Sequence, residues 1–271
     1  STMTQMTFLE LHNNSLVGTL PATWGPWMHG MQQLILHANY LDGTLPPSWA
    51  HWNRTLVTLD LSTNLLTGTI PPSWADISSP YFSVLSLRNN RLSGTLPAAW
   101  SHLRYLSQLY LDTNQFSGSI PSSWGGGTTR PGDGGGLGCN GDKKATAPKD
   151  ADQPRQAPLS TAAATTAAVH ASQPYLQVVT LQNNSLTGTI PPGLVNGSNL
   201  CILLLNDNRL RGPLPPLSPA LFRPNCTIYS GVEYSSQFRP AVLVHNNRLS
   251  CSLPGMPKAA QVVSDYHSSN V

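Results

Sequence analysis

The sequence predicts an α/β solenoid. We expect a right-handed stack of coils with a parallel β-sheet on the concave face and a mostly irregular or short-helical convex side. Two observations predict this fold. One string of Leu, Asn, Gly, Pro and Trp occurs eight times, and its first five copies follow one another at spacings of 25, 25, 26 and 24 residues. A unit this short cannot bury its apolar residues alone, so each copy must stack on its neighbours.

An Asn anchors each copy. The copy around Asn64 reads LDLSTNLLTGTIPPSW, from Leu59 to Trp74. Later copies are looser: Leu194 replaces the Trp after Asn184, and Cys251 replaces the Gly after Asn247. The eight anchors are Asn14, Asn39, Asn64, Asn90, Asn114, Asn184, Asn208 and Asn247.

The LxL segment before each anchor predicts a short strand, because apolar and mixed residues alternate there. Leu59 and Leu61 should then point into the core, and Asp60 and Ser62 away from it. Stacked copies of this segment would form one continuous parallel sheet along the solenoid.

The other repeat residues have structural roles as well. We expect the buried carboxamide of Asn64 to bond its own loop and the next coil, forming a ladder. Gly68 permits a backbone conformation that a side chain would penalise, and Pro71 favours a second short extended stretch. The Trp residues should fill the far side of the core and stack as a column; they are Trp24, Trp49, Trp74, Trp100 and Trp124.

The pattern LxLxxNxLxGxLP, which covers about 1–124 and 175–255, resembles plant-type leucine-rich repeats. Such repeats occur in receptor-kinase ectodomains, receptor-like proteins and polygalacturonase inhibitors. The LPxxW variant is similar to repeats of green-algal and trypanosomatid surface proteins. The resemblance implies a non-catalytic module that binds a protein, peptide or glycan on its concave face. It also implies an extracellular or cell-surface location, as the ectodomain or a fragment of a receptor-like or secreted protein. An intracellular cytoskeletal or ciliary scaffold of an alga stays open as the alternative.

A ligand should meet the outward-facing strand positions, because the repeat residues are committed to the core. These positions lie four and two residues before each anchor. Arg88, Tyr110 and Asp112 form the best candidate binding centre, since Tyr and Arg are frequent at binding hot spots. Arg88 and Asp112 could instead form an exposed ion pair with each other. The further candidate ligand-binding residues on these positions are Asp60, His37 and Gln182.

His12 and His37 occupy the same outward position on adjacent coils and should be stacked neighbours. With only Glu10 nearby they fall short of a metal ligand set, so we expect solvated surface histidines and neither a metal site nor a cofactor. The chain has no GxSxG, HExxH or phosphate-binding Gly loop, and an open sheet face lacks the enclosed pocket that a catalytic triad needs. We therefore expect no enzymatic activity.

Composition narrows the partners further. Only 10% of the residues are charged, against about 25% in a typical domain, and the net charge is +3 with scattered Lys and Arg. The sequence has no cluster of basic residues that would indicate nucleic-acid binding. No run of 18 apolar residues exists either, so we expect no membrane span in this chain.

Cysteines and glycosylation sequons bear on whether the protein is secreted. Secreted leucine-rich-repeat proteins often carry a disulfide cap near the C-terminal end, where Cys201, Cys226 and Cys251 lie, and a Cys226–Cys251 bridge would tie an insertion to the last coil. Three unpaired thiols are the alternative. Sequons for N-glycosylation occur at Asn13, Asn53, Asn183, Asn196 and Asn225. A chain this rich in Asn, Ser and Thr contains about as many by chance, so they support secretion only weakly.

The repeat register also sets the expected domain organisation. Residues 1–124 form coils one to five, 125–174 a disordered low-complexity insert, and 175–255 coils six to eight. The insert is rich in Gly, Ala, Thr and Pro and cannot bury enough apolar surface to offset its ordering entropy. A second insertion, 216–240, carries four aromatic residues and could pack as a local cap. The tail 256–271 should be flexible.

Overall fold

The computed structural model describes residues 5–52, 54–77, 79–103, 105–125, 176–195, 200–217, 226–228, 236–238 and 241–250. They belong to one unit, made of Ser1–Gly127 and Ser172–Val271, whereas the second unit, Thr128–Ala171, lies wholly outside them. The expectations for the insert beyond residue 125, for most of 216–240 and for the tail 256–271 therefore lie outside the described residues.

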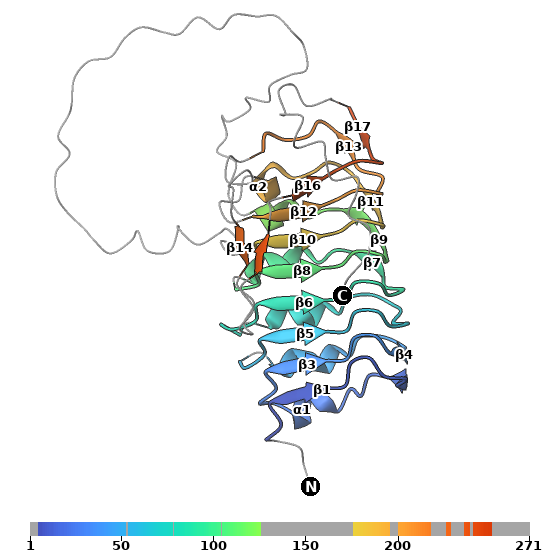
Figure 1. Cartoon of the computed structure of the whole chain (residues 1–271), viewed down its shortest axis with the longest axis vertical. Helices are drawn as coiled ribbons and strands as arrows, with labels where there is room; N and C mark the ends of the chain where they lie inside the picture. Colours follow the sequence, from blue (N-terminus) through green and yellow to red (C-terminus); the bar gives the residue numbers. More distant parts are fainter. Residues whose placement is uncertain are drawn as a thin grey trace, which may run out of the picture. The chain divides into compact units, whose positions relative to one another are not determined.

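One parallel sheet runs along the whole stack of coils (Figure 1). Its eight strands have three residues each and are hydrogen-bonded in the order in which they occur along the chain, which confirms the predicted eight coils. The strands are β1 (Phe8–Glu10), β3 (Gln33–Ile35), β5 (Thr58–Asp60), β6 (Val84–Ser86), β8 (Gln108–Tyr110), β10 (Val178–Thr180), β12 (Ile202–Leu204) and β16 (Ala241–Leu243).

The Leu residues of the LxL segments form the core on one side of this sheet, as predicted. Leu59 and Leu61 are fully buried and belong to one core cluster with the equivalent residues of the neighbouring coils. In the first coil the equivalent Leu11 is 37% exposed. Burial of the repeat residues thus depends on having a neighbouring coil on both sides.

The anchor Asn side chains link the coils, although in the direction opposite to the predicted one. Asn64 Nδ2 donates to the carbonyls of Leu61 in its own coil and Leu36 in the preceding coil, both at 3.1 Å. Its Oδ1 accepts the backbone N–H of Leu41, also in the preceding coil, at 3.0 Å. The carboxamide of Asn64 therefore bonds its own coil and the preceding coil.

The backbone turns in a left-handed conformation at two positions of each of the first seven coils, and at Asn246 in the eighth. The residue before the anchor has φ between 52° and 55°, as at Thr63, and the repeat Gly also has positive φ, as at Gly68. The extended stretch that follows the anchor pairs with its neighbours in small secondary sheets. Its strands are β2 (Val17–Thr19), β4 (Tyr40–Asp42), β7 (Ser93–Thr95), β9 (Gln115–Ser119), β11 (Ser185–Thr187), β13 (Arg211–Gly212) and β17 (Arg248–Leu249).

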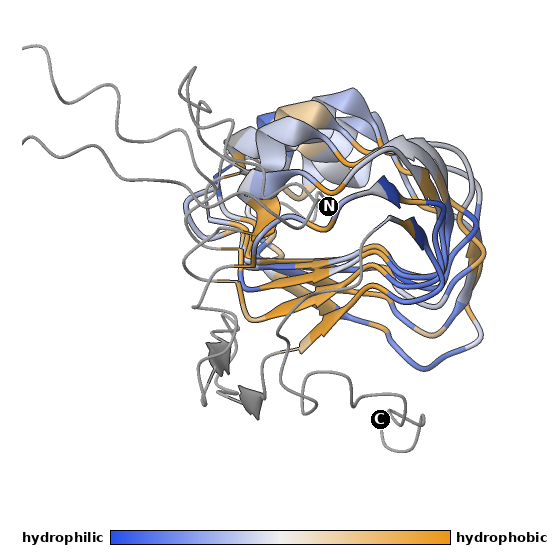
Figure 2. Cartoon of the chain, turned by 90° about the horizontal axis from the view of Figure 1, so that it is seen from above, coloured by the Kyte–Doolittle hydropathy of each residue, from blue (hydrophilic) through white to orange (hydrophobic). Residues whose placement is uncertain are grey.

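Short helices cover the side of the core opposite the main sheet, as the view along the stack shows (Figure 2). The Trp rings lie on this side, with Trp49 stacked between Trp24 at 6.3 Å and Trp74 at 6.4 Å, and Trp100 against Trp124 at 6.1 Å. The helices are α1 (Trp24–Trp27), α2 (Pro192–Val195) and the 3-10 turns η1 (Pro47–Trp52), η2 (Pro72–Asp76), η3 (Ala98–His102) and η4 (Ser122–Gly125).

Coils five and six stack directly although 70 residues separate their anchors. Strand β10 pairs with β8 in register, Val179 opposite Leu109. Asn184 Nδ2 donates to the Leu111 carbonyl at 3.1 Å, which is the same inter-coil bond that Asn64 makes. Within the second insertion, β14 (Cys226–Ile228) and β15 (Ser236–Phe238) form an antiparallel pair.

Candidate functional site

The candidate site lies on the face of the main sheet that points away from the Leu core. We call it the strip and define it by the positions two and four residues before each anchor. Strands β6, β8 and β10 form its centre, where Tyr110 lies in register between Ser86 and Thr180. Alternation along the strands directs these side chains away from the core.

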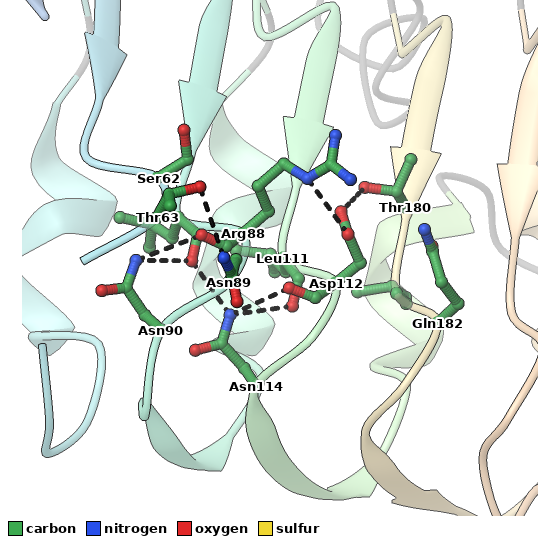
Figure 3. A network of polar contacts seen from close by, with 12 residues as sticks. Ser62, Thr63, Arg88, Asn89, Asn90, Leu111, Asp112, Asn114, Thr180 and Gln182 are labelled. Atoms are coloured by element: carbon green, nitrogen blue, oxygen red, sulfur yellow. Dashed lines mark hydrogen bonds and ion pairs between the residues drawn. The ribbon is translucent and has the colours of Figure 1, made fainter. Parts of the chain in front are cut away.

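Arg88 and Asp112 pair with each other at this centre (Figure 3). Arg88 Nε lies 3.3 Å from Asp112 Oδ2, and the hydroxyl of Thr180 donates to Asp112 Oδ1 at 2.6 Å. Each carboxylate oxygen therefore has a partner from the coil on one side. The structure confirms the pairing that the shared position of Arg88 and Asp112 predicted.

The expectation of an exposed pair was wrong. The Asp112 side chain is only 2% exposed, whereas that of Arg88 is 55% exposed. The aspartate is covered because side chains of the coils on both sides, Arg88 and Thr180, contact it. The arginine side chain extends over it into solvent. A buried carboxylate needs its partners, so Asp112 positions Arg88 and is itself poorly placed to contact a ligand.

Tyr110 is half-buried beside this pair, and its hydroxyl donates to Gln108 Oε1 at 2.9 Å. Burial raises the pKa of Tyr110 to about 12; the positive charge of Arg88 lowers this pKa, and the negative charges of Asp112 and Asp60 raise it. The phenol is therefore neutral at physiological pH. It offers a ligand an aromatic ring edge beside the Arg88 guanidinium.

A second group of candidates lies towards the first coils. His37 Nδ1 is 3.3 Å from Asp60 Oδ2, and Asp60 Oδ1 accepts the Ser62 hydroxyl at 2.6 Å. The His12 and His37 rings are stacked 4.7 Å apart, as their shared position predicted. Among the described residues, no group of three or more His, Cys, Asp or Glu is arranged to hold a metal ion.

The structure thus brings Arg88, Tyr110 and Asp112 together and sets His37 and Asp60 apart as a separate pair. Gln182 is half-buried and follows Asp112 at the same position of the next coil. Sequence reasoning missed the contributions of Thr180 and Gln108. Both lie on the outward face by strand alternation, so the signal was present, but neither residue type indicated a partner for Asp112 or Tyr110.

Cys201 is disulfide-bonded, which excludes the alternative of three unpaired thiols. The side chains of the other three cysteines lie outside the described residues, and so does the expected Cys226–Cys251 bridge. The sequence placed Cys201 in the region of the expected disulfide cap but assigned it no partner. Of the five sequon asparagines, Asn13 and Asn183 are exposed, and Asn53, Asn196 and Asn225 lie outside the described residues. No helix in the described part of the chain is long and apolar enough to cross a membrane.

A family model described as "Leucine Rich Repeat" matches residues 55–77, 82–103, 105–126 and 175–196. These matches fall on four of the coils. No curated protein matches the chain.

Solved structures of plant receptors share the fold. The plant peptide hormone receptor RGFR1, in complex with RGF2, has a TM-score of 0.62 and 25% identity over 93% of this chain and 30% of that chain. A TDR receptor has a TM-score of 0.61 and 26% identity, covering 91% of this chain and 32% of that chain. The ectodomain of the receptor kinase GASSHO1/SCHENGEN3 from Arabidopsis thaliana has a TM-score of 0.57 and 23% identity, covering 88% of this chain and 21% of that chain. The chain spans about a third or less of the length of these proteins.

Proposed function

We propose that this chain, a leucine-rich-repeat protein similar to the ectodomains of plant receptors, is a non-catalytic module that binds an extracellular peptide or protein on its strip. One observation carries the proposal: the guanidinium of Arg88 is held on the sheet face by a buried carboxylate, beside the half-buried phenol of Tyr110. The similar receptor RGFR1 is a peptide hormone receptor, solved in complex with RGF2, and this supports the class of ligand.

The geometry favours recognition because the arginine is preorganised. The Asp112 carboxylate engages Arg88 Nε, so the two terminal nitrogens of the guanidinium can donate to a ligand carboxylate or backbone carbonyl. Fixing the long side chain in advance reduces the conformational entropy that binding would otherwise cost. Arg and Tyr together supply the charge and the rigid aromatic surface typical of hot spots.

The disulfide at Cys201 supports an extracellular compartment over the intracellular scaffold. Disulfides form and persist in oxidising environments and are rare in the cytosol.

The test compares capture of peptides and proteins from extracellular fluid by the wild type and two matched variants. Arg88→Gln removes the strip guanidinium, and Arg91→Gln removes an exposed arginine three residues later that lies off the strip. We expect Arg88→Gln to weaken binding of the captured ligand at least about tenfold, as loss of a hot-spot residue does. Arg91→Gln should bind as the wild type does.

Circular dichroism checks that both variants fold. Equal affinities of Arg88→Gln and the wild type would place binding elsewhere and refute the role of the strip. A wild-type protein that captures nothing from extracellular fluid, but binds cytoskeletal proteins, would replace the proposal with the scaffold alternative.

A further inference from the structure

The residue immediately before each anchor has an unusual geometry. At Asn13, Asn89, Asn183 and Asn246 the backbone φ lies between 52° and 54°, in the left-handed region, and all four side chains are exposed. Each follows a strand of the main sheet at its C-terminal end. The next residue is the anchor. The carboxamide of Asn14 bonds only its own coil, and those of Asn90, Asn184 and Asn247 also bond the preceding coil. This position therefore presents an asparagine amide to solvent beside a fixed turn.

Only two of these four asparagines are sequons. Ser15 and Ser185 lie two residues after Asn13 and Asn183, whereas Arg91 and Arg248 follow Asn89 and Asn246. The four sites thus share one backbone geometry and differ in the residue that the glycosylation machinery recognises. The chain supplies its own matched controls.

The side-chain amides differ too. Asn246 Nδ2 donates to Asp207 Oδ1 at 2.6 Å, and Asn89 Nδ2 lies 3.4 Å from the Thr63 hydroxyl. Within the described residues, neither the Asn13 nor the Asn183 side chain makes a hydrogen bond. A modification at these two amides would cost the fold no interaction.

The disulfide is independent evidence that the chain passes through the compartment in which asparagines are glycosylated. The disulfide at Cys201 supports an oxidising environment, and in eukaryotes N-linked glycans are added in the same secretory route. The number of sequons alone could not separate these sites from chance. The exposed amides without a hydrogen bond favour Asn13 and Asn183 as sites, and the disulfide favours the compartment in which glycans are added.

We infer that Asn13 and Asn183 carry N-linked glycans. The donor is a lipid-linked oligosaccharide diphosphate: the amide Nδ2 attacks the anomeric carbon, and the new C–N bond forms as the C–O bond to the diphosphate breaks. The lipid diphosphate leaves with the electron pair, and the amide nitrogen loses one proton. The inference does not depend on the proposed ligand.

Both glycans would lie at the same edge of the main sheet, next to the strip residues His12 and Gln182. This edge holds the C-terminal ends of β1 (Phe8–Glu10) and β10 (Val178–Thr180). A ligand would then reach the strip from the opposite edge or from its open face.

The experiment secretes the full chain from eukaryotic cells and maps glycans site by site. Glycosidase release in heavy-oxygen water marks each formerly glycosylated Asn for mass spectrometry. We expect marks at Asn13 and Asn183 and none at Asn89 or Asn246. Secreted wild-type protein without marks at both Asn13 and Asn183 would overturn the inference, and this readout needs no variant to fold.

Four variants sharpen the result. Ser15→Ala and Ser185→Ala keep the asparagines but should each lose one mark, while Ser185→Thr keeps it. Arg91→Ser converts the matched control into a sequon and should add a mark at Asn89. A mark at Asn183 that survives Ser185→Ala would show that the modification is not sequon-dependent glycosylation and would refute it.

Discussion

The indole N–H explains why Trp occupies a position where an aliphatic residue would also fill the core. Trp74 Nε1 donates to the carbonyl of Pro46 in the preceding coil at 3.0 Å. Trp49 bonds Pro21 at 3.1 Å and Trp124 bonds Pro97 at 2.9 Å in the same way. A second ladder thus links coils one to three, and coil five to coil four, on the helical side, in addition to the Asn ladder.

Substitution of Trp74 separates packing from this hydrogen bond. Trp74→Phe keeps an aromatic ring but loses the bond to Pro46, so we expect it to lower the free energy of unfolding by about 1–2 kcal/mol. Trp74→Ala also loses the ring and should cost about 3–5 kcal/mol. Trp27→Phe is the control, because Trp27 is 52% exposed. Denaturant unfolding measures all three, and equal effects at Trp74 and Trp27 would contradict the ladder.

Tyr110 predicts a loss of stability at alkaline pH. Its pKa is raised from 10.0 to about 12, first by burial, so the folded state favours the neutral phenol. The stability that this contributes is complete below pH 10 and is lost as the pH rises towards 12, by up to about 3 kcal/mol. Tyr110→Phe cannot ionise, so its stability should fall less over this range.

The difference between the ultraviolet titrations of wild type and Tyr110→Phe isolates this phenol. We expect a step near pH 12. A step at pH 10 would show that Tyr110 is not buried in the folded protein.

At the scale of the element, the second extended stretch depends on Gly because two coils meet there. Gly68 has φ +78°, and a Cβ at this position would lie 2.9 Å from Thr44 Cγ2 of the preceding coil. Gly18 has φ +94°, but a Cβ there would meet nothing within 4 Å, since no described coil precedes it. Both positions need a residue that tolerates positive φ. Only Gly68 also needs to lack a side chain, because the preceding coil leaves no room for one.

Alanine substitution at the two glycines should therefore differ. The left-handed conformation costs about 1–2 kcal/mol in both variants. Gly68→Ala should cost about 1–3 kcal/mol more, because the new methyl group displaces the Thr44 side chain. Denaturation midpoints compare them, and a Gly18→Ala variant as unstable as Gly68→Ala would contradict the account.

At the scale of the whole molecule, the stack should fold without the second unit. Deleting Thr128–Ala171 shortens the distance between Asn114 and Asn184 from 70 to 26 residues, which equals the spacing of coils three and four. Coils five and six already pair through β8 and β10, so we expect a folded protein of equal or slightly higher stability, since a shorter loop costs less closure entropy.

Deletion of one true coil, residues 40–64, is the control. It keeps the register but removes one inter-coil interface, so it should lower the melting temperature. Calorimetry distinguishes the two deletions. Loss of cooperative unfolding on removal of Thr128–Ala171 would contradict the direct stacking of coils five and six.

The repeat register made the fold predictable from the sequence, including strands around Leu59 and Leu109 and the stacking of His12 on His37. It could not reveal the direction of the Asn64 bonds, because an anchor can reach either neighbouring coil until three-dimensional geometry selects one. It also could not show how deeply Asp112 is buried, because alternation gives the side of a sheet and not what covers it.

The sequence by itself determined the coil, since Leu, Asn, Gly and Pro at fixed spacing leave one way to bury a short repeat. It also determined which residues face outward, including Arg88, Tyr110 and Asp112. Only the tertiary structure decided their roles. The neighbouring coil supplies Thr180 to Asp112, buries that carboxylate and leaves the Arg88 guanidinium exposed. The physical reason is that the groups that bury and bond Asp112 belong to the adjacent coils. One of them, Thr180, lies 68 residues from Asp112 along the chain.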